Sequence, residues 1–127
     1  MTKRHLNARG KGEYTYDYDN DILLFKIKNR DYKISIDFGN LVFDVDTEGF
    51  ITGLQIFDAS KIFKLPKKAL KKIKNFEFNA DVEGKVITAQ LTFTCEMRNK
   101  AITHGQDFIR EALSTSIQNS EVVCSVA

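Results

Sequence analysis

Apolar side chains recur at every second position over most of this chain. Residues 32–38 place tyrosine, isoleucine and phenylalanine at the even positions and polar residues between them, and residues 87–97 repeat the pattern with threonines. A period of two belongs to a strand with one buried and one wet face. Because two- or three-residue turns separate these stretches, neighbouring strands should pair antiparallel. The alternation predicts antiparallel β-meanders and excludes a mainly helical chain.

Residues 46–60 combine a polar turn, an apolar strand and the start of a helix. Glu48-Gly49 supplies a backbone position that can adopt a positive φ, which a hairpin reversal needs. Ile51, Leu54 and Ile56 form a strand that is too apolar to face water. We expect a hairpin here that leads directly into helical structure.

Residues 58–74 interrupt the period of two. Asp58 or Ser60 can cap a helix, and Pro66 suits a first turn, so we expect two short helices rather than one. Their buried stripe comprises Ile62, Phe63, Leu65, Leu70 and Ile73. Strand periodicity returns at Asn75. Residues 106–117 fit a helix or a strand, and residues 121–126 are expected to add a last strand.

The predicted fold class is α+β, with two antiparallel β-meanders packed with one or two short central helices. Residues 1–12 are expected to form a flexible basic arm, and residues 13–127 a single α+β domain. No apolar run approaches the roughly 18 residues of a membrane span, and the basic N-terminus lacks the apolar stretch of a signal peptide. We therefore expect a cytoplasmic protein without membrane contact. Cys95 and Cys124 are expected to be free thiols.

The formal net charge of +2 is unevenly distributed. Residues 1–12 carry +4 and residues 58–74 carry +6, which leaves −8 for the remainder. Such basic segments can neutralise phosphates, although no helix-turn-helix, zinc-finger or RNA-recognition pattern accompanies them. The alternative is a solvated helix face. The nucleic-acid hypothesis names Lys3, Arg4, Lys64, Lys67, Lys68, Lys71 and Lys72.

Residues 44–51 imitate the first half of a calcium-binding loop. Asp44, Asp46 and Glu48 place carboxylates at alternate positions before a glycine. Gln55 stands where the loop would need a bidentate glutamate, so the alternative is a solvated hairpin tip. The sequence leaves open whether a second acidic turn, at residues 17–21, converges with this one.

Catalytic patterns are sparse. His104 with Cys95 or Cys124 is the one nucleophile–base pair available outside the arm, and no spacing supports it. Hydrolase, zinc-protease, phosphate-loop and dinucleotide motifs are missing from the sequence. We expect no enzyme and no cofactor. The four tyrosines are assigned to core packing rather than to a platform that stacks bases.

Two motifs in the first half resemble a small family catalogued as domain of unknown function 2283. The opening motif, Y-D-x-x-x-D-x-L, comprises Tyr16, Asp17, Asp21 and Leu23. The second motif comprises Asp46, Gly49, Ile51, Gly53, Leu54 and Ile56, and closes on Asp58, Ala59 and Ser60. The resemblance covers about residues 14–61, implies a β-rich α+β domain and supplies no catalytic residues. Gly53 is expected to allow a close backbone approach or a bulge.

The sequence favours a non-enzymatic binding or protein-interaction module. Antiparallel sheets leave edge strands that must be covered, so a homodimer through edge strands is the expected partner arrangement. The alternatives are nucleic-acid binding through the arm and the lysine-rich helix, and divalent-cation binding at the acidic turn.

Overall fold

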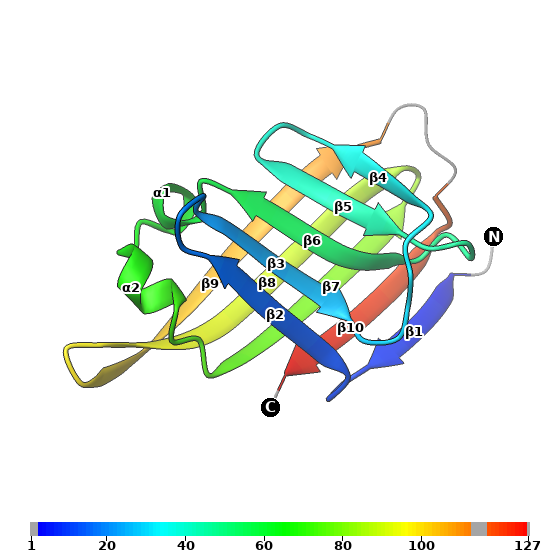
Figure 1. Ribbon diagram of the computed structural model, residues 1–127. Helices are drawn as coiled ribbons and strands as arrows, with labels where there is room; N and C mark the ends of the chain where they lie inside the picture. Colours follow the sequence, from blue (N-terminus) through cyan, green and yellow to red (C-terminus); the bar gives the residue numbers. More distant parts are fainter. Residues whose placement is uncertain (1–2, 113–116, 127) are drawn as a thin grey trace.

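The computed structural model describes residues 3–112 and 117–126, which form two five-stranded sheets packed face to face (Figure 1). One sheet has the order β1-β10-β7-β8-β9, with bounds Arg4–Ala8, Ser120–Val126, Asn75–Glu83, Val86–Met97 and Lys100–Glu111. The other has the order β2-β3-β6-β5-β4, with bounds Gly12–Asp17, Ile22–Ile27, Ile51–Phe57, Leu41–Val45 and Ile34–Asp37. The predicted alternation of strands and turns is confirmed along most of the chain.

The prediction of two short helices within residues 58–74 is confirmed, but the fold class was given too much helical character. Helix α1 (Ala59–Phe63) and helix α2 (Lys67–Leu70) have five and four residues, and both lie at one end of the sandwich rather than in its centre (Figure 1). Two sheets are right, but the chain is mostly β and not the α+β domain that was predicted. The apolar faces of the two sheets cover each other, so no helical layer is needed between them.

The prediction of a flexible arm is wrong for Arg4–Ala8. These residues form β1, which pairs in parallel with β10 in the register Arg4↔Ser120 to Ala8↔Cys124. Ala8 is buried and Leu6 packs against the core. The periodicity did not reveal this strand because its partner lies more than a hundred residues away and its five residues include only two apolar side chains, Leu6 and Ala8.

Aromatic side chains fill the space between the sheets. The rings of Phe25 on β3 and Phe76 on β7 lie 4.2 Å apart, and the ring of Tyr14 meets Phe76 edge-on at 6.0 Å. At the helical end, Phe63 of α1 packs on Phe93 of β8 with ring centroids 5.1 Å apart. The short helices thus close one end of the core.

The second family motif builds the turn between β5 and β6. Gly49 has a φ of 87°, as the hairpin required, and Asp46 Oδ1 accepts the N–H groups of Glu48 and Phe50 at 2.9 and 3.0 Å. A Cβ at Gly53 would lie 3.1 Å from Asp44 Oδ2 and 3.2 Å from the Phe25 carbonyl oxygen. The pairing register also shifts beside Asp44, so the expected close approach and the expected bulge are both confirmed.

The first family motif fixes the start of α1. Asp58 occupies the N-cap position without a side-chain cap, and the carboxylate of Asp21 takes that role by accepting the Ser60 N–H at 3.0 Å. The hydroxyls of Ser60 and Tyr16 each donate to Asp21 at 2.6 Å. Asp17 stabilises its own turn by accepting the backbone N–H of Asn20 at 3.1 Å.

The ambiguous stretch 106–117 is resolved in part. Residues up to Glu111 belong to β9, while residues 113–116 lie outside the described part of the chain. The last predicted strand is confirmed as β10. Neither described helix has the length or the composition to cross a membrane.

Candidate functional site

The lysines of residues 61–74 gather at the end of the sandwich where α1 and α2 lie, which we call the basic end (Figure 1). The chain folds locally in this way because Phe63, Leu70 and Ile73 are buried and the lysines between them turn outward. All seven are exposed except Lys67, which is half-buried: Lys61, Lys64, Lys67, Lys68, Lys71, Lys72 and Lys74. The predicted stripe is confirmed at Phe63, Leu70 and Ile73, whereas Ile62 and Leu65 are only partly buried.

Most of these ammonium groups have no counterion. Within the described residues, only Lys74 of this set forms an ion pair, with Glu96 at 3.0 Å. Cationic side chains elsewhere do form ion pairs: Lys3 pairs with Asp81 and Arg30 pairs with Asp46, both at 2.6 Å. The basic end therefore carries positive charge that the fold itself does not neutralise.

Tyr18 adds an aromatic ring to this surface. It is 41% exposed, and the ammonium groups of Lys71 and Lys67 lie 4.8 and 5.5 Å from its ring centroid. The assignment of the tyrosines to the core is therefore wrong for Tyr18 and for Tyr32, which is 62% exposed. It is right for Tyr14, whose ring packs in the core and whose hydroxyl donates to the Ile73 carbonyl.

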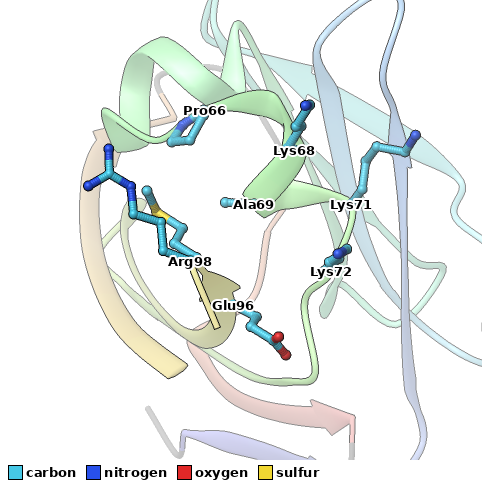
Figure 2. Close-up of a pocket in the computed structure, with 8 residues that line it drawn as sticks. Pro66, Lys68, Ala69, Lys71, Lys72, Glu96 and Arg98 are labelled. Atoms are coloured by element: carbon cyan, nitrogen blue, oxygen red, sulfur yellow. The ribbon is translucent and has the colours of Figure 1, made fainter. Parts of the chain in front are cut away.

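A cavity of about 550 Å³ opens between α2 and the β8–β9 hairpin (Figure 2). Its lining combines cations with apolar and acidic side chains: Pro66, Lys68, Ala69, Lys71, Lys72, Glu96, Met97 and Arg98. Arg98 was missed by the sequence analysis because it lies in a hairpin turn far along the chain. Both residues of that turn, Arg98 and Asn99, have positive φ angles of 51° and 63°.

Lys3 and Arg4 do not join this surface. The chain enters at the end of the sandwich opposite to α1 and α2 (Figure 1). Arg4 donates to the carbonyl and the carboxylate of Glu48, and its guanidinium carbon lies 4.4 Å from the ring centroid of Phe50. The two halves of the predicted nucleic-acid set are thus separate, and both Lys3 and Arg4 are engaged in ion pairs.

The acidic turn is organised by arginines. Arg30 donates to Asp46 Oδ2 from Nε at 2.9 Å and from a terminal nitrogen at 2.6 Å, and the same nitrogen donates to Glu48 at 3.1 Å. Asp44 accepts instead from Ser35 Oγ at 2.7 Å. The described residues contain no group of three or more histidine, cysteine or acidic side chains placed to hold a metal ion. Two of the three predicted carboxylates are already neutralised by guanidinium groups, which leaves a cation little to gain.

The acidic turn at residues 17–21 does not converge with the turn at 46–49. Ile22 on β3 pairs with Phe57 at the end of β6, while Lys26 pairs with Gly53 near its start. The two turns therefore lie at opposite ends of the same sheet. This answers the question that the sequence left open.

The histidine and the thiols do not form a dyad. His104 packs against both Phe63 and Phe93, with ring centroids 5.2 and 5.4 Å away, and its buried Nε2 has no hydrogen-bond partner in the described residues. Both cysteines are free and buried, as expected. Burial raises the pKa of Cys124 to about 11 and also raises the pKa of Cys95. Both thiols therefore stay protonated near neutral pH, which suits packing and not nucleophilic attack.

Comparison with known proteins places the motifs in a family. The model of the family described as "Protein of unknown function (DUF2283)" matches residues 13–60, close to the stretch that the motifs indicated. A "Putative hypoxanthine phosphoribosyltransferase" of Methanosarcina mazei is 34% identical over 95 residues, which cover 75% of this chain and 77% of that protein. An uncharacterized protein of Methanocaldococcus jannaschii is 30% identical over 115 residues, which cover 89% of this chain and 97% of that protein. No solved structure matches the chain. With both family motifs in place and similarity along most of two relatives, the chain belongs to the DUF2283 family.

Proposed function

We propose that this protein is a non-enzymatic binding module whose basic end binds the phosphates of nucleic acids. The observation that carries the proposal is the set of lysines at this end that form no ion pair within residues 3–112 and 117–126, namely Lys61, Lys64, Lys67, Lys68, Lys71 and Lys72. A polyanion that approaches them releases its counterions without breaking internal pairs.

Two further features support a polyanion as the ligand. Tyr18 offers an exposed aromatic face beside Lys67 and Lys71, and single-stranded nucleic acids combine backbone contacts to cations with bases stacked on such rings. The basic end also projects from a body that is otherwise acidic. This asymmetry steers an anionic partner toward one end of the sandwich.

The name of the Methanosarcina mazei relative is not extended to this chain as an activity. Enzymes that hold a phosphoribosyl group commonly cradle its phosphate at the start of a helix that follows a parallel strand. The two helices of the described residues have five and four residues, and no strand–helix–strand crossover joins two parallel neighbours there.

Neutralising part of the basic end is expected to weaken nucleic-acid binding. The variant K61Q/K64Q/K67Q should bind a labelled single-stranded RNA about tenfold more weakly than the unaltered protein, because three phosphate contacts are lost. Fluorescence anisotropy at about 50 mM and about 200 mM salt checks this, and the salt dependence of the variant should be shallower.

A matched control removes the same charge elsewhere. Lys11, Lys28 and Lys33 are exposed and lie in the β1–β2 and β3–β4 connections, so K11Q/K28Q/K33Q should change the affinity by less than about threefold. Equal weakening in both variants would show attraction to net charge without a site. No affinity for RNA or DNA at the lower salt concentration would end the proposal.

We also propose a homodimer through the free edge of β9. This edge strand has 12 residues and no proline, whereas the other edges β1, β2 and β4 have five, six and four residues. The two-residue turn makes Met97 and Lys100 a hydrogen-bonded pair, so every second residue of β9 from Lys100 onward bonds to β8. The residues between them, from Ala101 to Ile109, therefore direct their backbone N–H and C=O groups away from β8. Antiparallel pairing with a second copy would satisfy these groups.

Lysines on this edge are expected to abolish the dimer. Thr103 and Ile109 are exposed, so T103K/I109K should give a monomer in sedimentation equilibrium at about 100 µM protein, where the unaltered chain is dimeric. T15K places a lysine on the β2 edge and should leave the dimer intact. A monomeric unaltered protein, or dissociation by T15K, would contradict pairing through β9.

A further inference from the structure

The cavity between α2 and the β8–β9 hairpin has the size of a small-molecule site. Its volume of about 550 Å³ lies within the range of roughly 300–1,000 Å³ that is usual for ligand pockets. One wall comes from α2 and the residues that follow it, and the other from the end of β8 and the turn at Arg98 (Figure 2). The two walls come from segments far apart in the sequence, so the fold assembles the cavity.

Cations dominate the rim of this cavity. Lys68, Lys71, Lys72 and Arg98 line it, and none of them forms an ion pair with a described residue. The planar guanidinium of Arg98 can hold two phosphate oxygens at once, and ammonium groups complete the neutralisation of a phosphate dianion. A lone phosphate would fill a small part of this volume.

Apolar side chains line the cavity among these cations. Pro66, Ala69 and Met97 contribute surface that a bare inorganic anion cannot use. The thioether of Met97 adapts its shape and makes favourable contacts with aromatic rings. The cavity is therefore suited to an occupant with a carbon-rich or planar body attached to its charged group.

Glu96 gives the cavity a second pole, by which we mean an acidic group that accepts hydrogen bonds on the side away from Arg98. Arg98 and Glu96 extend toward opposite sides of the cavity (Figure 2). A hydrogen bond from Lys74 and the positive charge of that residue hold the pKa of Glu96 below its usual range, so this carboxylate is ionised near neutral pH and can only accept hydrogen bonds. Lys74 neutralises part of its charge, and the remaining lone pairs of the carboxylate can accept hydrogen bonds from hydroxyl or amino groups.

We infer that this cavity binds a small organic phosphate of mononucleotide size, with the phosphate at Arg98 and hydrogen-bond donors at Glu96. A nucleoside monophosphate has the required parts: a phosphate dianion, a flat ring for the apolar surface, and sugar hydroxyls or a ring amine that donate to a carboxylate. The inference rests on the proposed function, because it assigns a ligand class to one part of the same basic end.

Calorimetric titration of the full chain with AMP, adenosine and inorganic phosphate tests this assignment. AMP should bind at least about tenfold more tightly than either adenosine or phosphate, since each of those lacks one of the two poles. R98Q should weaken AMP binding about tenfold. Arg98 is exposed in a turn, and circular dichroism checks that the variant keeps its fold. Equal affinity for AMP and inorganic phosphate would overturn the inference.

The variant E96Q tests the role of the Glu96 carboxylate separately from that of the phosphate site at Arg98. Without the carboxylate, inorganic phosphate should bind more tightly while AMP binds more weakly, so the ratio of the two affinities falls about tenfold. An increase in both affinities would mean that Glu96 only repels anions, which contradicts its role as an acceptor.

Failure of this inference can be told apart from failure of the proposed function. K61Q/K64Q/K67Q changes lysines that do not line the cavity, so it should weaken RNA binding and change AMP affinity by less than about twofold. RNA binding without AMP binding overturns the cavity assignment and leaves the proposed function standing. AMP binding without RNA binding upholds the cavity and removes nucleic acid as the ligand of the basic end.

Discussion

Replacing Phe25 by alanine is expected to lower the free energy of unfolding by about 3–5 kcal/mol. Phe25 is 1% exposed, and its ring lies 4.2 Å from Phe76 and 6.3 Å from Tyr14, so it joins the two sheets across the core. Truncation removes apolar burial and leaves a cavity that the paired strands cannot close by moving. Urea denaturation followed by circular dichroism measures the change.

The matched control is Tyr32→Ala. Tyr32 is also a large aromatic residue, but it is 62% exposed, so its loss should change stability by less than about 0.5 kcal/mol. If both variants lost a similar amount of unfolding free energy, the change would come from removing an aromatic residue from the unfolded chain and not from lost packing between the sheets. A loss below about 1 kcal/mol for Phe25→Ala would contradict the packing described for the core.

Asp21→Asn is expected to destabilise the protein by about 2–3 kcal/mol near pH 7. Asp21 is 6% exposed and accepts hydrogen bonds from Tyr16 and from both the hydroxyl and the N–H of Ser60. An amide cannot accept at both positions, so at least one of these donors loses its partner. The start of α1, and with it one boundary of the basic end, should loosen.

The effect of Asp21 should depend on pH. Burial alone would raise the pKa of Asp21, but the hydrogen bonds from Ser60 and Tyr16 outweigh it and hold the pKa below its usual value. The folded state thus binds this proton less readily than the unfolded state. The stabilisation is therefore complete above the unfolded pKa of about 4 and is lost as the pH falls through the lower folded value.

Denaturation at several pH values checks the sign. The difference between the unaltered protein and Asp21→Asn should be largest near pH 7 and should shrink below about pH 4. Asp19→Asn, in the same turn and exposed, should differ from the unaltered protein by less than about 0.5 kcal/mol throughout. A difference for Asp21→Asn that stays constant down to about pH 3 would show that its charge is not what stabilises α1.

At the basic end, the sequence pattern predicted some of the surface residues and not others. The sequence placed the lysines outside a stripe that contains Phe63, Leu70 and Ile73, because the helical period determines which side chains share a face. The sequence pattern did not place Arg98 or Tyr18 beside these lysines. Arg98 reaches the basic end through the β8–β9 hairpin, and Tyr18 through the end of β2, which are contacts between distant parts of the chain.

The sequence by itself determined most of the strands and their turns, the family and the uneven charge, since these depend on side-chain period, positive-φ positions, local motifs and composition. Only the tertiary structure decided that the helices cap one end of a β-sandwich, that Arg4–Ala8 pairs in parallel with β10, and which charges neutralise each other. The physical reason is that sheet pairing and ion pairs are fixed by burial between segments far apart in the chain, and local periodicity carries no information about which distant face covers which.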